Sequence, residues 1–217
     1  MQEQFFGVLD KMRIIHITGP IGSGKTTLDM SLRNELGALD IKGEVARNKD
    51  VVFIGRIHKK YKNDYSDKFI KFGGLDDYLR KDNHDVGDLL NEIKKQEENG
   101  AKYCVMAGIR DFKKYVERLD GYEFYEVISL RGAKRVLAQR IKRRKYPAAK
   151  GELKRIEKEI DSYDRNIARW EVISTIYPDA YSIVFNKSML FTERMETMLN
   201  LMSKPVRTNG HYRRKFY

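Results

Sequence analysis

The chain has little of what several protein classes require. Only one of its 217 residues is cysteine, and four are proline. Cys104 therefore has no partner for an internal disulfide, and its apolar setting in residues 103–106 predicts a buried thiol. No apolar run reaches about eighteen residues, so no membrane span is expected. The first six residues lack the basic leader of a secretory signal, and a cytoplasmic setting is favoured.

Two motif classes are also missing. No Asn-Lys-x-Asp stretch of the kind that reads guanine occurs, which argues against a GTPase. The three histidines outside the first apolar run, His58, His84 and His211, show no spacing with cysteine or acids that indicates zinc. The length is small for a helicase motor and sufficient for one substantial core.

The whole chain carries a formal charge of +12, and this charge is concentrated in two segments where acidic residues are scarce. Residues 131–155 hold eleven Lys or Arg and one acid, and residues 204–217 hold five Lys or Arg and no acid. Such clustering favours attraction to a polyanion, either a nucleotide or a nucleic acid. A solvated face and a frayed tail are the alternative interpretations of the two segments.

What the sequence does contain is a phosphate-binding spacing: Gly, four residues, then Gly-Lys-Thr. Glycine lets successive backbone amides turn toward one anion, and the positive end of the following helix adds to them. We expect Lys25 to reach the β- and γ-phosphates of ATP and the Thr26 hydroxyl to ligate Mg²⁺. The expected ATP-binding residues are Gly19, Pro20, Ile21, Gly22, Ser23, Gly24, Lys25, Thr26 and Thr27.

The surroundings of this loop agree with it. Residues 13–18 form a short, mostly apolar run that predicts a buried strand, and residues 27–36 predict a helix that Gly37 ends. Asp29 lies just inside that helix, where we expect a solvated side chain rather than a ligand.

The rest of the chain alternates between strand and helix patterns. Further strands are expected at 51–54, 103–106, 125–130 and 181–185, and helices at 85–99, 111–119, 132–145, 152–175 and 192–201. This alternation predicts an α/β fold with a five-stranded parallel sheet and helices on both faces. We expect one domain over 1–203, with a lid at about 131–160 and a basic tail at 204–217.

An arginine-rich segment is the feature that separates the possible uses of a phosphate loop. Arg140 and Arg144 are four residues apart and share a helical face. Phosphoryl transfer depends on positioning and on stabilising charge, so a closing lid with several arginines suits a kinase. We therefore expect Arg140 and Arg144 to act in catalysis with Lys25.

With its phosphate loop, its basic stretch 139–144 and the strand-end sequence Ala107-Gly108-Ile109-Arg110-Asp111, the chain resembles the nucleoside monophosphate kinase superfamily. Thymidylate kinase-like and phage deoxynucleotide kinase-like members are the most similar. The resemblance implies a P-loop kinase fold, with Arg110 at the acceptor or its phosphate. It also implies that residues 186–188 lie near the adenine.

One residue pair departs from the pattern of those kinases. They usually carry an acid at the end of the third strand, where it helps to hold hydrated Mg²⁺, and this chain has Met106-Ala107. The role could pass to Asp76, to Asp111 or to water.

The resemblance implies that the acceptor site is built by the region between the second and third strands, which here is the connection 56–84. This connection is long and polar, and connections of that length are usually functional or mobile. Arg56, Gly74 and Asp76 are its candidate residues, and Asp76 or Asp111 could accept the proton of an alcohol. The stretch Gly73-Gly74-Leu75-Asp76 resembles a sequence feature of phage kinases that phosphorylate 5-hydroxymethyluracil within DNA.

The basic tail mixes cations with aromatic rings and could follow a polynucleotide. A DNA acceptor is therefore favoured. A free deoxynucleoside monophosphate and a nucleic-acid-binding ATP switch remain open, and the sequence does not indicate an oligomeric state.

Overall fold

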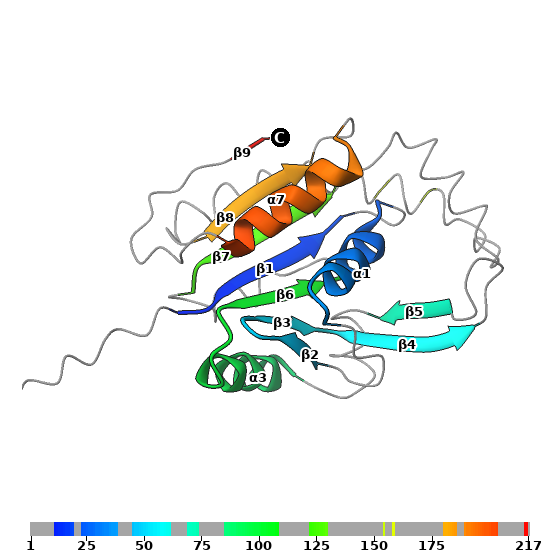
Figure 1. Cartoon of the computed structure of the whole chain (residues 1–217). Coiled ribbons are helices and arrows are strands. Elements are labelled where there is room, and N and C mark those ends of the chain that lie inside the picture. The colour runs from blue at the N-terminus through cyan, green and yellow to red at the C-terminus, as the bar shows by residue number, and fades with distance from the viewer. Residues whose placement is uncertain are drawn as a thin grey trace, which may run out of the picture.

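The chain is described from a computed structural model, shown in Figure 1. The structure describes residues 11–19, 23–38, 45–61, 69–73, 85–108, 122–129, 154, 158, 180–185, 189–203 and 215–216.

A seven-stranded sheet forms the centre of the molecule, in the order β2-β3-β6-β1-β7-β8-β9. Its five central strands, β3-β6-β1-β7-β8, run parallel to one another, which confirms the predicted parallel sheet. They lie within one residue of the predicted bounds: β1 Arg13–Thr18, β3 Val51–Ile54, β6 Tyr103–Ala107, β7 Phe124–Ser129 and β8 Ala180–Phe185.

Two edge strands were not predicted. β2 (Val45–Asn48) pairs antiparallel with β3, and β9 (Lys215–Phe216) pairs parallel with β8. The first has two adjacent apolar residues followed by two polar ones, and the second is only two residues long, so neither shows the two-residue period of a strand.

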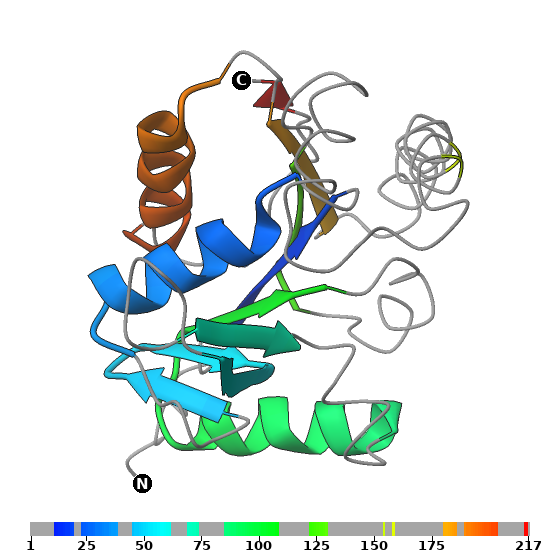
Figure 2. The same cartoon turned by 90° about the vertical axis from the view of Figure 1, so that its right-hand side faces the viewer.

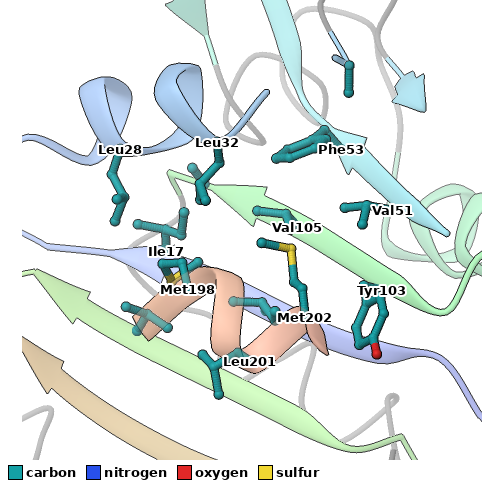
Figure 3. Close-up of a cluster of buried hydrophobic side chains, with 14 of the residues drawn as sticks. Ile17, Leu28, Leu32, Val51, Phe53, Tyr103, Val105, Met198, Leu201 and Met202 are labelled. Carbon is teal, nitrogen blue, oxygen red and sulfur yellow. The ribbon is translucent and has the colours of Figure 1, made fainter. Parts of the chain in front are cut away.

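Helices cover both faces of the sheet, as predicted (Figures 1 and 2). Side chains alternate across a strand, so neighbours in β1 face opposite layers. Ile15 and Ile17 belong to the core cluster beneath α1 (Lys25–Glu35) and α7 (Phe191–Ser203), whereas Ile14 packs in the cluster that includes the α3 residues (Val86–Glu98). Figure 3 shows the first cluster, where Leu28 and Leu32 of α1 face Ile17 and Met198.

The helix ends follow local chemistry. α3 begins with a capping box, in which the Asp85 carboxylate accepts from the Asp88 amide and the Asp88 carboxylate accepts from the Asp85 amide, both at 2.9 Å. Lys154 and Lys158 are helical, within the helix expected at 152–175. Within the described part of the chain, none of the helices has the length and apolar character needed to cross a membrane.

A second, two-stranded sheet occupies part of the segment expected to be a long connection. β4 (Arg56–Tyr61) and β5 (Phe69–Gly73) pair antiparallel, with Ile57 opposite Phe72 and His58 opposite Lys71. A register shift between Lys59 and Tyr61 interrupts the ladder. A single residue, Gly55, separates the end of β3 from the start of the hairpin, so the hairpin is joined directly to the main sheet.

Cys104 is fully buried in β6, as expected, and burial raises the pKa of its thiol. A thiol in that state is a packing element and a poor nucleophile.

A buried ion pair closes the amino-terminal end of the sheet. The Arg13 guanidinium donates to Glu123 Oε2 from Nε at 3.0 Å and from Nη2 at 2.8 Å, with both side chains 2% exposed. Arg13 Nη1 also donates to the Leu201 carbonyl at the end of α7, and Tyr125 donates to Glu123 Oε1. Arg13 thus joins β1 to the segment before β7 and to the helix that covers one face.

We predict that Arg13→Met lowers the free energy of unfolding by about 3–5 kcal/mol, because it leaves the Glu123 carboxylate buried without its cation. Chemical denaturation measures this. Replacing both partners, Arg13→Met with Glu123→Leu, should restore most of the loss. The exposed pair Lys102–Asp50 gives the control, since Lys102→Met should cost less than about 1 kcal/mol. Equal effects at the two sites would contradict this account.

Candidate functional site

The candidate site lies where β1 ends and α1 begins. All six residues of β1 are buried, and the strand stands between β6 and β7 in the middle of the sheet. The chain leaves β1 at Thr18 and enters α1 at Lys25. The strand, loop and helix that the phosphate motif requires are therefore present in this order.

The amino-terminal end of α1 is suited to an anion. Its cap residue, Gly24, has φ 92° and ψ 15°, a left-handed conformation that favours glycine, and no side chain caps the helix. The first amides of a helix have no partner within it, and the helix dipole adds positive potential at the same point. No acidic side chain occupies the first turn of α1. This terminus is therefore built to receive a phosphate.

The Lys25 side chain bonds back to the start of the loop in this structure. Its Nζ donates to the Gly19 carbonyl at 2.5 Å, which joins the first residue of the helix to the first residue after β1. The Lys25 side chain is partly buried, whereas Thr26 and Thr27 are exposed. A bound triphosphate would offer Lys25 a charged acceptor in place of a neutral carbonyl, and hydrogen bonds to charged groups are the stronger ones.

The residues present fit Mg²⁺ only in part. The Thr26 hydroxyl is exposed in the first turn, the position that ligates the ion in phosphate-loop proteins. Ala107, at the end of β6, is fully buried and supplies no carboxylate. Among the described residues, no group of three or more His, Cys, Asp or Glu could hold a metal ion. Among the described residues, Thr26 is thus the candidate Mg²⁺ ligand, and phosphate oxygens and water would complete the coordination shell of the ion.

His16 lies in β1, three residues before Gly19. It is fully buried in β1, and burial together with the charge of Lys25 lowers the pKa of its imidazole to about 3. Its register partner in β6 is Met106. His16 is therefore a neutral core residue beside the loop, as expected for a histidine inside a buried strand.

The expectation for Asp29 was wrong. It is 0% exposed, and its Oδ2 accepts from Arg33 Nε at 2.7 Å. Burial raises the pKa of the Asp29 carboxyl, and Arg33 opposes that shift. The error came from counting Asp29 as a first-turn residue. Its four-residue spacing from Arg33, beside Leu28 and Leu32, was the signal that both charges lie on the packed face.

The remaining predicted site residues divide into two groups. The structure brings Gly19, Ser23, Gly24, Lys25, Thr26 and Thr27 together around the end of β1, and Ser23 is buried there. Arg56 is the first residue of β4. The other predicted positions lie outside the described residues: Pro20, Ile21, Gly22, Gly74, Asp76, Arg110, Asp111, Arg140, Arg144 and residues 186–188.

We predict an acid dependence of stability from His16. Its pKa is depressed in the folded state, so the unfolded chain binds one more proton between about pH 6.5 and pH 3. The free energy of unfolding should fall by up to about 1.4 kcal/mol per unit as the pH is lowered through this window, apart from other groups. Denaturant titrations of wild type and His16→Leu check this. An identical slope in the variant would contradict the assignment.

No curated protein sequence gives a significant match. Among solved structures, a shikimate kinase from Bacteroides thetaiotaomicron is similar at 18% identity, covering 89% of this chain and 99% of that one, with a TM-score of 0.36. At that score the similarity carries no inference about this chain.

The family comparison is the informative one. A family model described as an AAA domain, AAA_18, matches residues 15–162, more than half of the chain. The match begins inside β1 and includes the whole phosphate loop and α1. The chain belongs to this AAA domain family of phosphate-loop proteins.

Proposed function

We propose that this chain is an ATP-dependent phosphotransferase, a kinase of the phosphate-loop type. The observation that carries the proposal is the uncapped amino terminus of α1, with Gly24 in a left-handed conformation and Lys25 held at the loop entrance. The parallel sheet with β1 at its centre supports it, since ligands in such folds bind beyond the carboxyl ends of the strands.

The proposed nucleotide side of the reaction uses the amino terminus of α1, Lys25, Thr26 and the basic segment 131–155. The first amides of α1 receive the phosphates, and Lys25 exchanges the Gly19 carbonyl for the β- and γ-phosphates. Thr26 would hold Mg²⁺, which would supply positive charge to neutralise the transferring group. The arginines of the basic segment, Arg140 and Arg144, close over this group and exclude competing water.

We further propose that the acceptor is the hydroxymethyl group of 5-hydroxymethyluracil in DNA. The acceptor oxygen forms a bond to the γ-phosphorus, the bond to the β-phosphate oxygen breaks, and ADP leaves. The hydroxyl proton passes to a carboxylate, for which Asp76 and Asp111 are candidates.

Charge supports a polymeric acceptor. The hairpin segment 56–73 carries six Lys or Arg and two Asp, and it adds to the basic segments 131–155 and 204–217. A polynucleotide gains affinity from phosphate contacts beyond the reacting base, whereas a mononucleotide needs only a local pocket.

Two other functions are the alternatives to this proposal. A free deoxynucleoside monophosphate kinase needs only the phosphate loop and an arginine clamp. A nucleic-acid-binding ATP switch with little catalysis is favoured by Ala107, which stands where related kinases carry an acid.

We predict that Lys25→Met abolishes phosphoryl transfer and weakens ATP binding at least about ten-fold, because the phosphates lose their charged donor. Isothermal titration with ATP·Mg²⁺ and a transfer assay with γ-labelled ATP measure the two effects. Lys94→Met, at an exposed lysine of α3, is the charge-matched control and should leave both unchanged. Retained transfer in Lys25→Met would remove the phosphate loop from the mechanism.

The acceptor is tested by supplying labelled ATP with three substrates in parallel. These are a 5-hydroxymethyluracil oligodeoxynucleotide, the same oligodeoxynucleotide with thymine, and deoxynucleoside monophosphates. We predict label in the first only, with binding that weakens steeply as salt rises. Label in a mononucleotide would identify the free-nucleotide kinase. Label only in free phosphate would favour the switch.

A further inference from the structure

The buried pair Asp29–Arg33 lies on the helix that carries the phosphate loop. Asp29 follows Thr26 by three residues, so the two occupy neighbouring positions one turn apart on α1. Both members of the pair are 0% exposed, and they are 2.7 Å apart. Asp29 Oδ1, the second carboxylate oxygen, is buried and has no hydrogen-bond partner among the described residues.

Stability alone does not account for this pair. A buried ion pair offsets its own desolvation poorly, and apolar residues of similar volume often stabilise a core as well or better. The neighbouring positions Leu28 and Leu32 show that this face of α1 accepts aliphatic side chains (Figure 3). A pair that leaves one carboxylate oxygen unpaired at such a place points to a role in positioning.

Arg33 reaches the exit of β3. Its guanidinium carbon lies 4.8 Å from the centroid of the Phe53 ring, and its Nη2 donates to the Gly55 carbonyl at 3.4 Å. Asp29 accepts from Nε of the same guanidinium, so two of its nitrogens are held by different elements. The 3.4 Å bond to the Gly55 carbonyl is longer, and therefore weaker, than the 2.7 Å bond to Asp29.

Gly55 is the joint between the two sheets. β3 ends at Ile54, β4 begins at Arg56, and Gly55 has φ 140°, a conformation that side-chain-bearing residues rarely adopt. The backbone direction at this one residue sets where the β4–β5 hairpin starts. A donor on the Gly55 carbonyl therefore constrains the base of the hairpin.

We propose that Asp29 and Arg33 are positioning residues that fix the β4–β5 hairpin relative to the phosphate loop. One helix then carries the groups that hold ATP at its first turn and, two turns later, the arginine that holds the start of the acceptor segment. Arg56 follows Gly55 directly, so its backbone is placed by the same contact. This inference rests on the proposed function in assigning the segment after β3 to the acceptor.

The test uses the double variant Asp29→Leu/Arg33→Met, which leaves no buried unpaired charge. We expect hydrogen–deuterium exchange at amides 56–61 to quicken about ten-fold while exchange in β1 stays unchanged, because only the hairpin base is released. We expect ATP affinity to stay within about two-fold and kcat/KM for the DNA acceptor to fall about 10–100-fold. Arg33→Lys keeps a charge beside Asp29 but lacks the planar fork, so it should also quicken hairpin exchange.

Each outcome decides the inference. Unchanged exchange at 56–61 in the double variant overturns it, whatever the activity. Loss of ATP affinity in parallel with transfer also overturns it, since the pair would then serve the phosphate loop. If wild type transfers phosphate to no acceptor, the proposed function fails, and the exchange measurement alone still shows whether the pair positions the hairpin.

Discussion

The structure depends on the burial of β1. All six of its residues are buried, and the two parallel neighbours satisfy its backbone hydrogen-bonding groups. The strand is therefore held rigidly at the point where the phosphate loop begins. An anion site made of backbone amides needs that rigidity, because amides that could relax away from the phosphate would contribute little binding energy. The core on both sides of β1 is therefore a condition of the site.

Two buried arginines, Arg13 and Arg33, join different elements around β1 and α1. Arg13, at the start of β1, binds a glutamate and the last turn of α7, and it secures the end of the sheet away from the loop. Arg33, on α1, is held by Asp29 and contacts the exit of β3. The first pair joins strands and a helix of the core, while Arg33 of the second pair joins α1 to Gly55, the residue that precedes the β4–β5 hairpin.

The sequence predicted the five central strands to within one residue, because each is a short apolar run bounded by polar or glycine residues. It also predicted α1, α3 and α7 from their periodicity. It did not predict β2 or the β4–β5 hairpin. Residues 56–73 alternate poorly and are rich in lysine, so composition indicated a connection, and only cross-strand pairing between distant residues makes it a hairpin.

For the site, motif reasoning succeeded where one local segment supplies the chemistry. The phosphate loop needs only consecutive residues, and Gly24, Lys25 and Thr26 stand where the motif places them. Asp29 was misjudged because its environment comes from the tertiary contact of α1 with β3, and the spacing from Arg33 was the only local sign of it. The absent strand-end acid was visible in the sequence as Met106-Ala107, and the buried Ala107 shows that no described carboxylate replaces it at that point.

The central claim is that the amides between β1 and α1 hold the tail of ATP. Crystals grown with a non-hydrolysable ATP analogue and Mg²⁺ test it most directly. The account predicts triphosphate density at the amino terminus of α1, with Lys25 Nζ moved from the Gly19 carbonyl to the β- and γ-phosphates. A nucleotide bound elsewhere, with Lys25 still on the Gly19 carbonyl, would contradict it.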